Sequence, residues 1–109
     1  MPRHEFGIMK NTPVTGRRFD KYEPHKYNCI SVDDAYILPL LERLSSERFY
    51  WHTIDVVGSG LAYYGITLIS PESSRRMLVI IADKKELVPL STLLRKAIEE
   101  NCFVIHFGI

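Results

Sequence analysis

Residues 48–70, RFYWHTIDVVGSGLAYYGITLIS, decide the expected fold, because two long runs of aromatic and β-branched residues flank a pair of glycines. Residues of this kind favour strands. A short Gly-Ser-Gly connection between two strands supplies the positive φ angles that a tight hairpin turn needs. The pattern therefore predicts strands over 48–57 and 61–70 that pair with each other and turn at residues 58–60.

The same glycines raise the alternative of a phosphate-binding loop. A dinucleotide fingerprint places glycines as G-x-G-x-x-G between a strand and a helix, whose free amide groups bind the pyrophosphate. Here the glycines stand at 58, 60 and 65, and the segment after Gly60 is too rich in aromatic and β-branched residues to begin a helix. The turn is the better interpretation, so no nucleotide or other cofactor is expected. Gly65 would then leave room for a neighbouring side chain, such as that of Trp51.

Apolar patterns outside this ribbon predict three further strands and two helices. The expected strands are 27–32, 77–82 and 102–109, and the expected helices follow the acidic caps at 33–34 and at 83. Asp83 and Glu86 have the spacing of a capping box. Each helix carries a proline six residues after its cap and should open with a loose or 3₁₀ turn. The polar segment PESSRR, residues 71–76, is interpreted as a turn.

These elements follow an N-terminal arm, residues 1–27, which mixes prolines, glycines, charges and aromatic residues without a regular period. The arm has enough apolar residues to pack on the core, residues 28–109, with one short edge strand around residues 6–10. The element order after the arm is β-α-β-β-β-α-β. The simplest assembly is a single α+β domain of 109 residues, a two-layer sandwich in which a mixed sheet of about five strands carries both helices on one face.

Composition narrows the classes of function. The net charge is only +1, so the chain has no strong field that would attract nucleic acid or a membrane surface, and no apolar run approaches the roughly 18 residues that span a bilayer. Cys29 and Cys102 both lie in apolar runs and are expected to be buried thiols. Together with the lack of an apparent secretory leader, they favour a cytoplasmic location. No pair of residues has metal-ligand spacing, so no metal is expected.

Histidines offer the main alternative of catalysis. His52 and His106 lie in expected strands, and if their faces coincide, they could line a polar spot with Tyr64 and act as acid and base in a pocket between sheet and arm. In the other interpretation each imidazole is half-buried and hydrogen-bonded to a neighbour. Cys102 and His106 are roughly 13 Å apart along a strand, too far to form a catalytic pair. The acidic pair at 33–34 could act as general acid and base or hold Mg²⁺, but its place between a strand and a helix is also what capping requires, and capping is the preferred interpretation.

The segment GRRFDKYEPHKY, residues 16–27, interleaves Arg17 and Arg18 with aromatic residues, a combination used to bind single-stranded nucleic acid. Asp20 and Glu23 interrupt the basic run, so nucleic acid is a second alternative and not the expected partner.

Aromatic side chains on both faces of the 48–70 ribbon favour binding over catalysis. Two helices on one face of the sheet cannot cover all of these rings, and exposed aromatic residues mark interfaces between proteins. We therefore expect a small protein-interaction or inhibitor-like domain that forms a homo-oligomer or binds another protein. No catalytic residue is assigned, and the candidate binding residues are Tyr50, His52, Tyr63, Tyr64, His106, Arg17 and Arg18.

Overall fold

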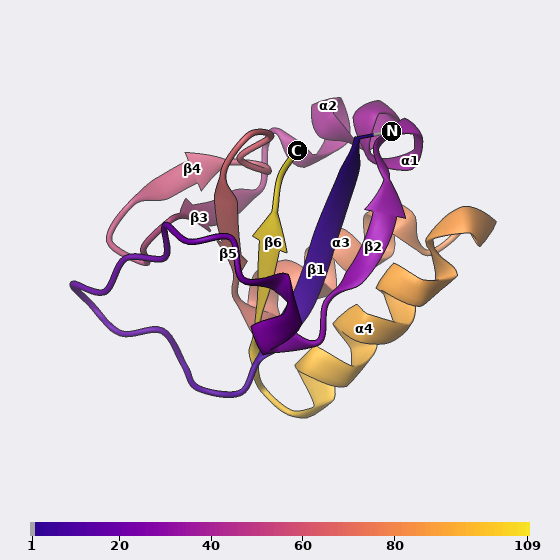
Figure 1. Ribbon diagram of the computed structural model, residues 1–109. Helices are drawn as coiled ribbons and strands as arrows, with labels where there is room; N and C mark the ends of the chain where they lie inside the picture. The colour runs from indigo at the N-terminus through magenta and orange to yellow at the C-terminus, as the bar shows by residue number, and fades with distance from the viewer. Residues whose placement is uncertain (1) are drawn as a thin grey trace.

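The computed structural model describes residues 2–109, which form one six-stranded antiparallel sheet with helices packed on one face (Figure 1). The order of strands across the sheet is β2-β1-β6-β5-β3-β4. The strands are β1 (Arg3–Met9), β2 (Ile30–Asp33), β3 (Arg48–Trp51), β4 (Val57–Ser59), β5 (Ile66–Ile69) and β6 (Phe103–Phe107). The expected single α+β domain is confirmed.

The two longer helices, α3 (Pro71–Ile81) and α4 (Val88–Glu99), pack against each other and on the sheet. Two single-turn helices, α1 (Asp34–Ile37) and α2 (Leu41–Leu44), flank the 3₁₀ turn η2 (Leu38–Leu40) between β2 and β3. Further 3₁₀ turns are η1 (Pro24–Tyr27) and η3 (Lys85–Leu87). No helix within residues 2–109 is long and apolar enough to cross a membrane.

The expected mixed sheet is wrong, because every strand pair is antiparallel. Parallel pairing was expected between strands joined through a helix, but β2 and β3 are not neighbours in the sheet, and 77–82 is not a strand. In addition β1, which was expected at an edge, lies between β2 and β6. Its residues pair on one side in the register His4 with Val32 and on the other in the register Phe6 with His106. A strand from the N-terminal arm therefore lies inside the sheet, between the first and the last strand of the expected core.

The expected turn at 71–76 and strand at 77–82 are also wrong, since both segments belong to α3. Ser70 is the N-cap and accepts a hydrogen bond from the backbone N–H of Ser73, and Pro71 occupies the first turn, where its missing N–H costs nothing. Within the helix, Met77 and Ile81 are buried four residues apart, whereas Val79 faces solvent.

The ribbon 48–70 contains three short strands in place of the expected long pair. β3 pairs with β4 on one side and with β5 on the other, and the turn between β3 and β4 lies at residues 52–56, before the glycines. Gly58 lies under the ring of Trp51, because a Cβ at Gly58 would stand 2.3 Å from Trp51 Cε2. Trp51 is therefore accommodated by Gly58, while Gly65 makes room for His52.

The helix starts agree with the sequence in part. Asp33 caps α1 by accepting a hydrogen bond from the N–H of Ala35, as expected. The second proline-containing segment opens with the 3₁₀ turn η3, as expected, whereas the first opens with α1 and has its 3₁₀ turn, η2, around Pro39. The capping box at Asp83 and Glu86 is wrong, because α4 begins at Val88 without a side-chain cap.

Both faces of the sheet carry a hydrophobic cluster. On the helix face, Phe6, Phe49 and Val104 pack against the helices. On the other face the buried cluster is Met9, Phe19, Ile66, Leu68, Ile105 and Phe107. Phe19 belongs to residues 10–29, hereafter the connection, which links β1 to β2 and crosses the sheet face opposite α3 (Figure 1). This irregular segment therefore acts as a third layer.

Candidate functional site

A chain of hydrogen-bonded polar side chains runs through the protein between the sheet and α1. The imidazoles of His4 and His106 are joined by an Nδ1 to Nε2 contact of 2.9 Å, and both residues are fully buried. His4 Nε2 lies 2.7 Å from Asp34 Oδ1, which the Tyr63 hydroxyl also contacts at 2.8 Å. At the other end, His106 Nδ1 lies 3.0 Å from the buried Thr67 hydroxyl. Three strands and one helix are thereby linked.

With both rings neutral, one set of tautomers satisfies every contact of this polar chain. Tyr63 donates to the Asp34 carboxylate, which also accepts from His4 Nε2–H. His4 Nδ1 then accepts from His106 Nε2–H, and His106 Nδ1 accepts from the Thr67 hydroxyl. Thr67 in turn accepts from the backbone N–H of Ala62 at 2.9 Å. Each polar side-chain atom of these five residues therefore has a partner, and buried polar groups need one because a low-dielectric interior makes an unpaired group costly.

The surroundings of the polar chain shift the pKa values of three of its groups: His106, Asp34 and Tyr63. Burial, together with the neighbouring His4, lowers the pKa of His106 to about 3. Hydrogen bonds from His4 and Tyr63 lower the pKa of Asp34 despite its partial burial, and the bond to Asp34 raises the pKa of Tyr63 to about 12. At neutral pH the chain therefore holds a carboxylate, a neutral His106 and a protonated phenol.

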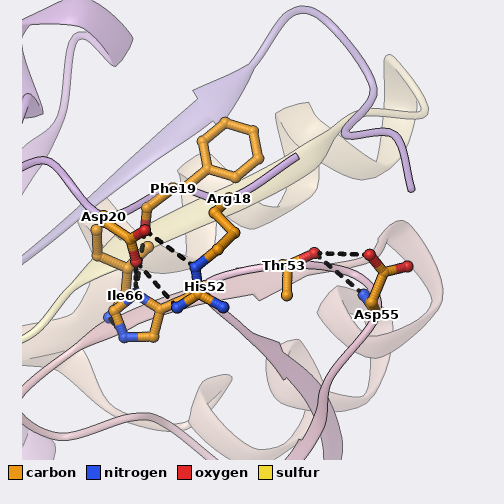
Figure 2. A network of polar contacts seen from close by, with 7 residues as sticks. All are labelled: Arg18, Phe19, Asp20, His52, Thr53, Asp55 and Ile66. Atoms are coloured by element: carbon orange, nitrogen blue, oxygen red, sulfur yellow. Dashed lines mark hydrogen bonds and ion pairs between the residues drawn. The ribbon is translucent and has the colours of Figure 1, made fainter. Parts of the chain in front are cut away.

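His52 lies on the other face of the sheet, where it holds the connection in place (Figure 2). Its Nδ1 is 3.0 Å from the backbone oxygen of Phe19 and 3.1 Å from a carboxylate oxygen of Asp20. A backbone bond from Phe19 N–H to His52 O, at 2.7 Å, completes the clamp. Nearby, Asp55 accepts a hydrogen bond of 2.7 Å from the N–H of Gly16. His52 has a positive φ of 64°, a conformation that the turn after β3 imposes.

A shallow hollow of about 870 Å³ opens beside this clamp, and two tyrosines stand at its rim. Tyr64 is 81% exposed and Tyr22 is 65% exposed, and Ile109 adds an exposed aliphatic side chain. We call these three residues, with the hollow between them, the tyrosine surface. Its charged side chains are of both signs: Arg3, Glu5 and Asp20, and His52 also lines it.

The seven candidate binding residues thus lie in several places. Tyr64 and His52 line the same hollow, whereas His106 lies in the buried polar chain on the opposite face, with Tyr63 at that chain's end. The faces of His52 and His106 therefore do not coincide. Tyr50 is half-buried, with its ring centroid 6.3 Å from that of Phe103.

The two arginines of the connection have different surroundings. Arg18 forms a bidentate contact with Asp20, whose pKa this hydrogen bond lowers. The guanidinium carbon of Arg17 lies 4.9 Å from the ring centroid of Phe19. Of these two arginines, only Arg17 belongs to no ion pair among the described residues.

Sequence reasoning missed that His4, Asp34 and Thr67 form a polar chain with His106. Capping was the preferred interpretation of Asp34. The pairing of β1 with β6 brings together His4 and His106 from positions 102 apart. The sequence held one signal for His4. Side chains two residues apart lie on the same face of a strand, so His4 shares a face with the apolar Phe6 and Ile8 and could have been expected to be buried with them.

Nucleophilic and metal chemistry find little support in residues 2–109. Cys29 and Cys102 are free thiols, and burial raises the pKa of Cys29 to about 12, so its reactive thiolate is suppressed. Among these residues, no group of three or more His, Cys, Asp or Glu side chains is arranged to hold a metal ion.

Comparison with known proteins adds no further assignment, since no family model, curated protein or solved structure matches the chain.

Proposed function

We propose that this chain is an interaction protein that pairs with a second copy of itself through the tyrosine surface. The observation that carries the proposal is the exposure of Tyr64 and Tyr22 around one hollow. Tyrosine supplies a large contact area with little loss of side-chain entropy, and exposed tyrosines are frequent hot spots of interfaces.

Self-pairing is favoured by the mixed chemistry of this surface. A twofold interface brings one patch against its own copy, so protruding groups must meet hollows and cations must meet anions. The tyrosine surface has a projecting ring at Tyr64, a hollow beside it, and both signs of charge in Arg3 and Glu5. A surface of one charge would repel its copy. Other protein partners, including the target of an inhibitor-like domain, are outcomes of the test below.

The polar chain of His4 and His106 supports a binding role over a catalytic one. Both imidazoles and Thr67 are fully buried, so no substrate reaches their nitrogen or hydroxyl atoms in this conformation. A general acid or base must come within hydrogen-bond reach of the reacting group. Their satisfied contacts fit a structural role.

Sedimentation velocity over a range of concentrations tests the proposal. The wild-type chain should dimerise, and Tyr64→Ser should weaken the dimer by about tenfold or more, as for a hot-spot tyrosine. Tyr36→Ser is the matched control, because Tyr36 is an exposed tyrosine of α1 outside the tyrosine surface. A wild-type chain that stays monomeric would refute self-pairing and favour a different protein partner. Equal effects of the two substitutions on the dimer would refute the tyrosine surface as its interface.

A further inference from the structure

A second hollow, of about 580 Å³, lies at the other end of β1 from the tyrosine surface. It opens between the connection and α4, and its size is within the range of small-molecule sites. Its apolar lining comes from three parts of the chain: Ile8 and Met9 of β1, Phe19 and Tyr27 of the connection, and Leu93 of α4. We call this hollow the basic pocket, for the charges described next.

Four cations and one acid line the basic pocket: Lys10, Arg17, Lys26, Lys96 and Glu100. The local charge is therefore +3, although the whole chain carries only +1. None of the four cations belongs to an ion pair among the described residues, whereas Arg3, Arg18 and Arg76 each do. Like charges gathered around one hollow repel each other, so an anion bound there would relieve that repulsion.

Two of these cations are already positioned by aromatic rings. Arg17 lies 4.9 Å from the ring centroid of Phe19, and Lys26 Nζ lies 5.7 Å from that of Tyr27. Cation–π contacts of this kind restrict the flexible side chains before any ligand binds. Less entropy is then lost on binding. Neutral donors, the amides of Asn11 and Asn28, also line the basic pocket.

We propose that the basic pocket binds a small organic phosphate, with the phosphate among the four cations and an apolar or aromatic group against the apolar lining. A phosphate dianion matches a local charge of +3 better than a single carboxylate does, and Arg17 offers the planar guanidinium that contacts phosphate oxygens in pairs. Bare inorganic phosphate would leave the apolar lining of Met9 and Leu93 uncovered.

A nucleic acid is the less favoured occupant of these cations. Single-strand binding uses an extended basic groove with stacking platforms along it. Here the cations surround one hollow, Phe19 is buried, and the neighbouring Arg18 is paired with Asp20.

The test is calorimetric titration of the full chain with phenyl phosphate, inorganic phosphate and phenol, together with nuclear magnetic resonance to locate the affected amides. Phenyl phosphate should bind saturably at millimolar concentration or below and more tightly than the other two compounds. Lys96→Glu should weaken it by about tenfold. Arg95→Glu is the matched control, because it changes the net charge equally on the same helix at an exposed residue outside the basic pocket.

Three results would overturn the proposal. Equal weakening by Lys96→Glu and Arg95→Glu would mean that phosphate responds only to overall charge. Equal affinity for phenyl phosphate and inorganic phosphate would remove the role of the apolar lining. Failure of phenyl phosphate to saturate would also refute the site, and salt-dependent binding of a thymidine oligonucleotide in that case would assign the cations to nucleic acid.

Discussion

Replacing His106 with glutamine should reduce the pH dependence of folding stability, because His106 is neutral in the folded protein and titrates freely in the unfolded chain. Glutamine keeps an N–H for His4 Nδ1 and an oxygen for the Thr67 hydroxyl, so the polar chain retains its connections. Only the titratable group is lost.

The magnitude follows from the pKa of His106, which burial lowers from 6.5 to about 3. Below pH 6.5 His106 binds a proton in the unfolded chain but not in the folded protein. Protonation therefore lowers the free energy of the unfolded state relative to the folded state, and the free energy of unfolding falls as the pH falls. With respect to this group, the free energy of unfolding is highest above pH 6.5, decreases down to about pH 3 and is constant below that value. Its slope is about 1 kcal/mol for each pH unit within this window.

Urea unfolding between about pH 7 and about pH 5 measures this slope, because its derivative counts the protons taken up on unfolding. In the wild-type chain, His106 should lower the urea midpoint by roughly 0.5–1 M for each pH unit. His106→Gln should remove one proton from that count. The control is His25→Gln, at an exposed histidine of η1. If wild type and His106→Gln have the same slope, His106 is not buried as a neutral group and the proposed tautomers are wrong.

Two further substitutions test the packing of the sheet and of the connection. Gly58→Ala should force the Trp51 ring away, break its hydrogen bond to the backbone, and lower the melting temperature by roughly 5–10 °C. Because the chain has a single tryptophan, an unchanged emission spectrum and melting temperature would contradict the close contact. Phe19→Ala should cost about 3 kcal/mol and speed hydrogen exchange across the connection, whereas Val14→Ala, at an exposed position, should do neither. Slow exchange in Phe19→Ala would mean that other contacts hold the connection.

Local patterns predicted the elements that depend on neighbours in sequence. The final strand and the cap at Asp33 were correct, and so was the 3₁₀ turn that opens the second proline-containing segment. Each follows from chemistry within a few residues, such as the missing N–H of a proline or a carboxylate beside a free amide.

The segment 70–82 failed because a short apolar run has no clear period. MLVIIA fits a buried strand as well as one face of a helix, and the polar residues before it resemble a turn. The deciding signal was Ser70 followed by Pro71 and Glu72, a helix start that was overlooked. Here the capping chemistry outweighs the β propensity of the apolar residues.

The polar chain and the pockets could not be read from the sequence, because both depend on which strands become neighbours. His4 meets His106 only because β1 is inserted beside β6. The basic pocket likewise gathers Lys10, Lys26 and Lys96 from three separate segments. Spacing rules describe residues on one element and carry no information on such contacts.

The position of β1 also bears on how the protein folds. The first and last strands of the chain, β1 and β6, are direct partners in the middle of the sheet, so the sheet stays split into two parts until residues 103–107 have been synthesised. Pairing two strands so far apart in the sequence loses conformational entropy before any contact between them forms. This loss slows folding. Until β6 forms, the edges of β1 and β5 that pair with it lack a partner and are open to pairing with other chains.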